Sequence, residues 1–158
     1  MTTARALLIL GPSFRRKTGK DPLTALERFD GLFFRIARKY LEDTKDIDVS
    51  VMIDNLTLID GTTPLEFNEA QGAKWGGKII LQKNVERSRE KNKVYLSHKL
   101  KNKKYSEVFI SMGKEFARAL PDLKGYNINV VFPASGGIGP KALALKEWLS
   151  SRTLHPTD

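Results

Sequence analysis

The residues best suited to binding chemistry in this chain are cations gathered between Lys74 and Tyr105. This basic segment (residues 74–105) holds eleven of the 27 lysines and arginines but only two of the 18 carboxylates, so its charge of +9 equals that of the whole chain. Clustered cations favour a polyanionic partner, because binding releases the counterions condensed on phosphates. The cations are Lys74, Lys78, Lys83, Arg87, Arg89, Lys91, Lys93, Lys99, Lys101, Lys103 and Lys104. The alternative interpretation is a solvated, weakly ordered insertion.

Aromatic residues among these cations are candidates for stacking on nucleic-acid bases. Trp75 lies between Lys74 and Lys78 and is the strongest candidate, with Tyr95 as the second. Stacking on aromatic rings is common to proteins that bind single-stranded nucleic acids, because every base has a flat face. The pattern therefore predicts contacts to bases as well as to phosphates.

Two loops and one lysine supply a second set of candidate anion ligands. A serine- and glycine-rich turn before the last expected helix would direct backbone N–H groups at an anion at the helix N-terminus. The candidates are Ser135, Gly136, Gly137 and Gly139 in this turn, Ser13, Arg15, Arg16 and Lys17 in the loop after the first strand, and Lys114. The alternatives are a tight turn that needs glycine for its dihedral angles, an exposed basic loop and a solvated lysine. Neither loop has the dinucleotide-binding or Walker pattern, so no cofactor is expected.

Residues for catalysis are few. The two histidines, His98 and His155, stand in no metal-ligand spacing and offer no partner for a Ser/His/Asp triad, so no metal site is expected. Asp54, at the end of the second expected strand, could act as a general base or accept a ribose hydroxyl, or it could cap the following turn with Asn55. The chain has no cysteine, which excludes disulfides and thiolate ligands and favours a cytoplasmic location.

These candidates must be positioned by strands and helices that the hydrophobic pattern predicts. The expected strands are 5–10, 47–53, 107–111 and 128–132, and the expected helices are 24–41, 114–120 and 141–151. Thr24 with Glu27 predicts a capping box, Asp30-Gly31 a break, and Pro140 the first position of the last helix, in which Trp148 faces the core. Residues 56–59 either extend the second strand or form a short turn. Short, interrupted stretches of helical spacing in the basic segment predict one or two poorly buried helices.

This alternation of strands and helices predicts an α/β fold. We expect a mostly parallel four-stranded sheet flanked by helices, in a single domain over residues 1–152. The basic segment 74–105 would be an insertion between the second and third strands, and residues 153–158 a flexible tail. No apolar run approaches the ~20 residues that a membrane helix needs, and the N-terminus leads into a strand, so we expect no membrane partner and no signal peptide.

Four pieces of the chain resemble YaaA-like domains, a family of small Rossmann-like proteins that are mostly uncharacterised. The pieces are residues 8–13, 25–40 and 108–116, and the turn 136–139 with the helix around Trp148. The resemblance implies a compact α/β domain, and the member that names the family is associated with DNA binding and protection from oxidative stress. Relatives often have a Cys or Ser before a lysine after the first strand, matched here by Ser13 and Lys17. They often have Ser-Ala-Lys after the second strand, where this chain has Ile53-Asp54-Asn55, so no activity that needs that serine and lysine is carried over.

Three functions remain open from the sequence. The favoured one is a non-enzymatic nucleic-acid-binding protein, for DNA or RNA and open to a place in a ribonucleoprotein, in which residues 74–105 and 15–17 contact phosphates. The first alternative is an enzyme acting on a nucleotide or a base at the carboxyl edge of the sheet, where loops 13–17, 54–55 and 135–139 would meet. The second is an interaction module whose basic segment folds against an acidic protein partner.

Overall fold

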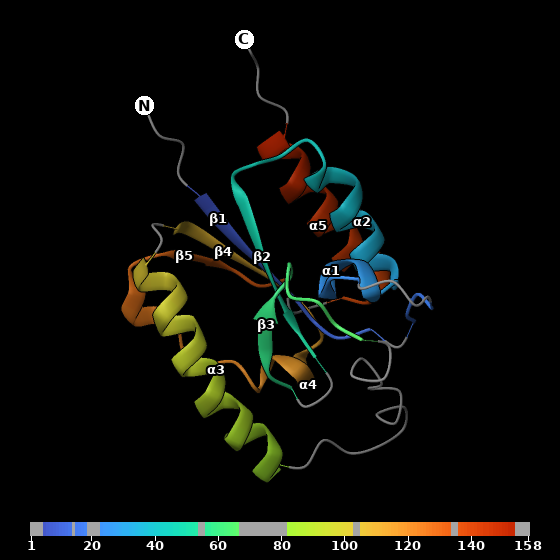
Figure 1. Ribbon diagram of the computed structural model, residues 1–158. Helices are drawn as coiled ribbons and strands as arrows, with labels where there is room; N and C mark the ends of the chain where they lie inside the picture. Colours follow the sequence, from blue (N-terminus) through green and yellow to red (C-terminus); the bar gives the residue numbers. More distant parts are fainter. Residues whose placement is uncertain are drawn as a thin grey trace.

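The strands form one sheet with helices on both faces. The computed structural model describes residues 5–13, 15–18, 23–53, 56–66, 82–102, 105–133 and 136–153. Its elements are β1 (Arg5–Leu10), α1 (Ala25–Arg28), α2 (Leu32–Leu41), β2 (Ile47–Met52), β3 (Leu58–Asp60), α3 (Gln82–Asn102), β4 (Tyr105–Ser111), α4 (Lys114–Ala117), the 3₁₀ turn η2 (Lys124–Tyr126), β5 (Asn129–Val131) and α5 (Ile138–Thr153). The strand order is β3-β2-β1-β4-β5 (Figure 1). All neighbours pair in parallel except β2 and β3.

The α/β class and the mostly parallel sheet are confirmed, but the expected number of strands is wrong. The fifth strand is β3, which turns back on β2 so that Ser50 lies opposite Asp60 and Met52 opposite Leu58. The turn is closed by Leu56, whose φ of 68° is left-handed and whose amide donates to the Ile53 carbonyl at 2.8 Å. Three residues are too short to carry a readable alternation, so the sequence left this segment open between a strand extension and a turn.

The first expected helix is two helices. The capping box of Thr24 and Glu27 begins α1 as predicted, and the backbone hydrogen bond from Thr24 lowers the pKa of Glu27. This helix ends at Arg28, and α2 begins after Gly31, so the break predicted at Asp30-Gly31 is confirmed. Phe29, between the two helices, is fully buried, so the break places an aromatic side chain in the core.

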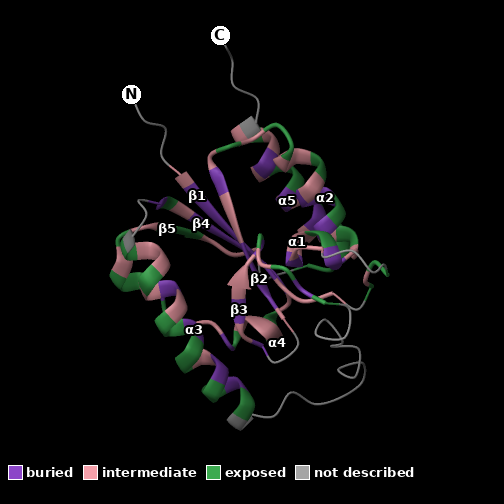
Figure 2. Cartoon of the chain, in the orientation of Figure 1, coloured by how far each residue is buried: buried purple, intermediate pink, exposed green. Residues whose placement is uncertain are grey.

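The two faces of the sheet have separate cores. Alternation along β1 sends Leu8 and Leu10 to the face covered by α2 and α5, and Leu7 and Ile9 to the face covered by α3. Figure 1 shows α2 and α5 side by side, with α3 on the other side of the strands. In Figure 2 the strands β1 and β4 are buried along most of their length, whereas buried and exposed residues alternate along α3.

The basic segment, in which one or two poorly buried helices were expected, forms a single helix of 21 residues, α3. It connects β3 with β4 across one face of the sheet, so this part of the segment is a layer of the fold and not an insertion. Its inward side buries Val85 and Leu96 together with two polar residues, Ser88 and Asn92. These polar residues interrupt the apolar spacing, and for this reason the hydrophobic pattern predicted less burial than α3 has.

The last helix begins three residues earlier than expected. α5 starts at Ile138, so Pro140 is its third residue and not its first. Proline is tolerated there because the first amides of a helix have no partner within it. Gly136, just before the helix, has a φ of +88°, and a Cβ on it would lie 3.1 Å from that of Pro140, so this position needs glycine.

Candidate functional site

A cavity of about 210 Å³ lies at the carboxyl edge of the sheet, between the ends of β4 and β5 and the start of α5. It is lined by Phe33, Ser111, Met112, Gly113, Pro133, Gly136, Gly137, Ile138 and Lys141. Parallel α/β sheets bind ligands at this edge. The site lies beside the strand at which the connecting helices change from one face of the sheet to the other. Here that strand is β1, because the helices that follow it cover one face and α3, which leads into the neighbouring β4, covers the other.

The segments that follow β1 and β4 pack closely against each other at this edge of the sheet. The amide of Gly11, just after β1, donates to the Ser111 carbonyl at 3.0 Å. A Cβ on Gly11 would lie 2.6 Å from the Cβ of Met112, so a larger residue would push the two loops apart. Glycine at this position therefore holds the ends of β1 and β4 together beneath the cavity.

Both polar side chains among the described lining residues can donate hydrogen bonds. Ser111 is 7% exposed, and its hydroxyl has no hydrogen-bond partner within the described residues. Lys141 is half-buried and forms no ion pair with any residue that the structure describes. No carboxylate is among the described residues that line it. A cavity with an ammonium, a hydroxyl and the start of a helix at its wall is suited to an anion.

The structure brings together only part of the anion set expected from the sequence. Gly136 and Gly137 line the cavity as part of the expected turn, whereas Lys114 is exposed at the start of α4 and Gly139 is exposed on α5. Asp54 and Ser135 lie outside the described residues. The sequence analysis missed Lys141 and Ser111. Two features of the sequence could have indicated them: Lys141 follows the glycines within the first helical turn, and Ser111 ends the apolar run of a strand.

Hydrogen bonds hold the loop after β1 against α1. The Ser13 hydroxyl donates to the Arg15 carbonyl at 3.0 Å, and the buried Arg28 donates to the Lys17 carbonyl at 2.8 Å. Arg15 and Lys17 are exposed and Arg16 is half-buried, and the expected ligands of this loop are not among the residues that line the cavity. The loop and the glycine turn therefore do not form one site with the groups described.

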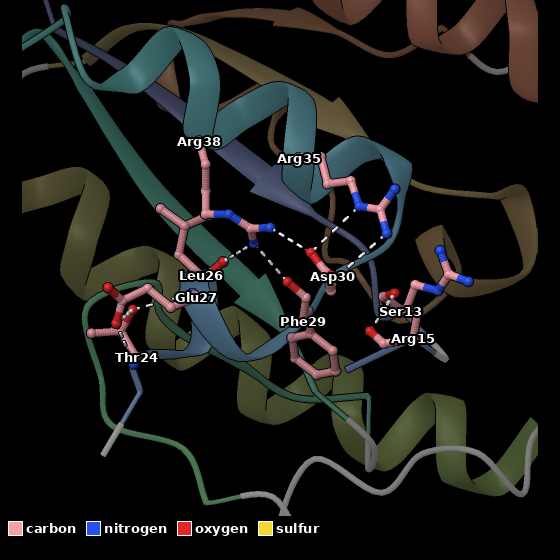
Figure 3. A network of polar contacts seen from close by, with 9 residues as sticks. All are labelled: Ser13, Arg15, Thr24, Leu26, Glu27, Phe29, Asp30, Arg35 and Arg38. Carbon is pink, nitrogen blue, oxygen red and sulfur yellow. Dashed lines mark hydrogen bonds and ion pairs between the residues drawn. The ribbon is translucent and has the colours of Figure 1, made fainter. Parts of the chain in front are cut away.

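Two further arginines near this loop have structural partners (Figure 3). Arg38 donates to Asp30 at 2.6 Å and to the Leu26 and Phe29 carbonyls at 2.9 and 2.7 Å. Burial would raise the pKa of Asp30, but hydrogen bonds and charges from Arg35 and Arg38 outweigh it and lower that pKa. These cations stabilise the junction between α1 and α2 and are engaged within the fold.

The outward side of α3 carries the basic segment's most coherent group of side chains. Spacings of four, three, four and three residues align them along one side of the helix, and all are exposed. We call this the α3 ridge: Arg87, Lys91, Val94, His98 and Lys101. At 1.5 Å per residue it is roughly 21 Å long. The carboxylates Glu86 and Glu90 lie to one side of it.

Other cations of the basic segment have different places. Lys99 pairs with Asp60 at 2.7 Å, and Arg89 donates to the Arg118 carbonyl at 2.9 Å. Lys93 is exposed but lies off the ridge. Lys74, Trp75, Lys78, Lys103 and Lys104 lie outside the described residues, as does the side chain of Lys83.

Tyr95 turns toward the sheet and not toward solvent. Its hydroxyl lies 2.7 Å from that of Ser50 and donates to Asp60 at 2.5 Å. Burial and the hydrogen bond to Asp60 raise its pKa. The ring packs against the core beneath α3, so its place differs from that of an exposed stacking residue.

No protein-family model, curated protein or solved structure matches this chain. The resemblance to YaaA-like domains therefore stays a prediction. Across the described ranges, no three His, Asp or Glu side chains gather as a metal-binding group, and no helix combines the length and hydropathy needed to cross a bilayer. Function is accordingly inferred from the cavity and the α3 ridge.

Proposed function

We propose that this protein binds nucleic acid, DNA or RNA, through the α3 ridge. The observation that carries the proposal is the alignment of Arg87, Lys91 and Lys101 on the outward side of one helix. None of the three forms an ion pair with a described residue, whereas Lys99 on the inward side does. Exposed, unpaired cations in a row have the electrostatic character that phosphate backbones select.

The arrangement disfavours a purely structural role for these side chains. Arg87 and Lys91 are like charges four residues apart, which destabilises a helix by about 0.2–0.5 kcal/mol. A polyanion that lies along the ridge would turn this repulsion into two favourable contacts. The ridge length of roughly 21 Å corresponds to about six phosphates of one strand of a duplex, at 3.4 Å each.

The α3 ridge stands on a helix that the fold holds in place, which reduces the conformational entropy lost on binding. Asn92 fixes the middle of α3 through three hydrogen bonds, at 2.8 Å to the Leu58 amide and at 2.9 and 2.8 Å to the Leu56 and Ala119 carbonyls. Lys99 fixes its later turns through Asp60. The cations thus stand on a helix whose position is set by the fold, and preorganised surfaces bind with a smaller ordering penalty.

The test compares two triple variants with equal loss of charge. Arg87→Gln, Lys91→Gln and Lys101→Gln remove the ridge cations, and Lys39→Gln, Lys45→Gln and Lys146→Gln remove three exposed lysines elsewhere. Fluorescence anisotropy with labelled single- and double-stranded DNA and RNA oligonucleotides gives affinity over a range of salt concentrations. We expect the log–log salt slope to fall by about two to three units in the ridge variant only, because each phosphate contact contributes about 0.7–0.9.

Two results would remove this proposal. One is the absence of binding to any of the oligonucleotides at low salt. The other is an equal loss of slope in both triple variants, which would mean that net charge and not the ridge attracts the strand. Circular dichroism spectra of both variants check that α3 remains helical.

A further inference from the structure

We infer that the cavity at the carboxyl edge binds a phosphate monoester, at a site separate from the α3 ridge. The ridge faces solvent beyond one side of the sheet, whereas Phe33 and Lys141, which line the cavity, come from the α2 and α5 side. Loss of one site would therefore leave the other in place.

The unpartnered hydroxyl of Ser111 is the first observation that points to a ligand. Ser111 is 7% exposed, lines the cavity and has no hydrogen-bond partner for its side chain in the described part of the chain. It stands two residues after Phe109 on the same strand, so both side chains leave β4 toward the α5 face. The small part of Ser111 that stays accessible lies at the cavity wall, where an anion would accept the hydrogen bond of its hydroxyl.

The start of α5 is the second observation. This helix has 16 residues, and the amides of Ile138 and Gly139 precede any that can pair within it, since the first such bond joins the Lys141 amide to the Gly137 carbonyl at 3.2 Å. A Cβ on Gly137 would meet no atom within 4 Å, so a ligand can approach the backbone there. The partial positive charge of the helix end adds to the charge of Lys141.

Size and lining limit the class of ligand. The cavity, at about 210 Å³, is smaller than the roughly 300–1,000 Å³ of sites for drug-sized molecules, so a phosphate with a small attached group fits. Phe33, Met112 and Pro133 give the rest of the wall an apolar surface for that group. A monoester carries up to two negative charges at its end, which suits one ammonium and one helix terminus better than an internal diester does.

The experiment is a titration followed by ¹⁵N–¹H NMR, with inorganic phosphate, adenosine monophosphate and adenosine as probes. Saturable shifts are expected for residues 111–113 and 136–141 with the two phosphates and not with adenosine. We expect Lys141→Gln to weaken binding at least tenfold and Ser111→Ala several-fold, whereas Lys146→Gln, five residues further along α5, leaves affinity within twofold. Ser111→Ala should leave the thermal midpoint unchanged, because its hydroxyl has no partner to lose.

Two sources of the phosphate are separated by a pair of oligonucleotides that differ only in a 5′-phosphate. A preference for the phosphorylated strand that Lys141→Gln removes would identify a strand end, and its absence beside saturable nucleotide binding would identify a free small molecule. Absence of saturable shifts with both phosphates, or an equal effect of Lys146→Gln, would overturn the inference. The ridge triple variant should retain phosphate binding, so failure of the ridge proposal is distinguished from failure here.

Discussion

The two faces of the sheet are covered in different ways. On one face α2 and α5 pack through large apolar side chains, among them Phe34, Leu145 and Leu149, against Leu8 and Phe109 of the strands. On the other face α3 is the one long helix among the described residues, beside the short α4 and the segment that holds Ala119 and Leu123. Its inward side combines two fully buried apolar residues with polar side chains that reach partners on the sheet. A helix with little apolar surface can therefore still be a layer of a fold, and its outward side is left available for cations.

Aromatic contacts characterise the face under α2 and α5. The rings of Phe29 and Phe34 have centroids 5.2 Å apart, and those of Phe109 and Trp148 are 4.8 Å apart. The Trp148 indole donates to Glu107 at 2.6 Å, so its polar end is satisfied at the rim. Burial of apolar area is the main stabilising contribution on this face.

Polar contacts characterise the face under α3. The Asn92 side chain is 1% exposed and bonds to three backbone groups from two other segments. Nearby, Tyr95 and Lys99 both contact Asp60, while Tyr105 donates to Asp48 at 2.6 Å. Hydrogen bonds thus add to the apolar contacts of α3, which come from few residues.

The largest expected effect is on the apolar face. Phe109→Ala should lower the free energy of unfolding by about 3–5 kcal/mol, because it removes a buried ring and leaves a cavity against Trp148. Urea denaturation measures the change. Leu143→Ala, at a side chain that is 56% exposed on α5, is the control and should change stability by less than about 0.5 kcal/mol. A similar loss in both variants would show that this face is not closely packed.

The next effect tests whether polar contacts hold α3. Asn92→Ala should cost about 3 kcal/mol, because it leaves an amide and two carbonyls without the partners they have now. Asn84→Ala on the same helix is exposed and serves as the matched control for helix propensity. Hydrogen exchange should also show faster opening of α3 than of α5 in the Asn92 variant. Equal exchange in the two helices would contradict the contrast between the two faces.

The smallest effect concerns alkaline pH. Burial, then a hydrogen bond to a carboxylate, raises the pKa of both Tyr95 and Tyr105 in the folded protein. Because a tyrosine in the unfolded chain ionises near pH 10, their stabilising contribution is present below pH 10 and is lost as pH rises toward the folded values. Tyr95→Phe should cost about 1 kcal/mol at pH 8.

The same variant should also weaken the decline of stability above pH 10, and adding Tyr105→Phe should weaken it further. Denaturation curves at pH 8, 10 and 11 give this comparison. A decline as steep in the double variant as in the parent protein would show that these two tyrosines do not cause the sensitivity.

Local signals in the sequence were sufficient for several elements. The apolar run after Arg5, ended by Gly11, gave β1 with its observed bounds. The capping box at Thr24 and the break at Gly31 were readable because both depend on residues within one turn of each other. By contrast, β3 exists because β2 offers an edge, and α3 is buried because Asn92 finds partners 27 to 36 residues away.

The candidate sites, too, were predicted only in part from the sequence. The confinement of charge to residues 74–105 is a property of the sequence, but which of those cations face solvent depended on how α3 lies on the sheet. The glycine turn was predicted from the sequence as an anion ligand, and Gly136 and Gly137 of this turn line the cavity. Its neighbours in the cavity, Ser111 and Lys141, could not be found, since they come from a strand and a helix brought together only by the strand order.

By itself, the sequence determined the α/β class, the first strand, the capping box at Thr24 and the location of the excess charge, because each depends on residues close together in the chain. The tertiary structure decided the fifth strand, the burial of α3, the division of its cations into inward and outward sets, and the lining of the cavity. Those features depend on hydrogen bonds and packing between distant segments, and such partners are specified only when the sheet has assembled.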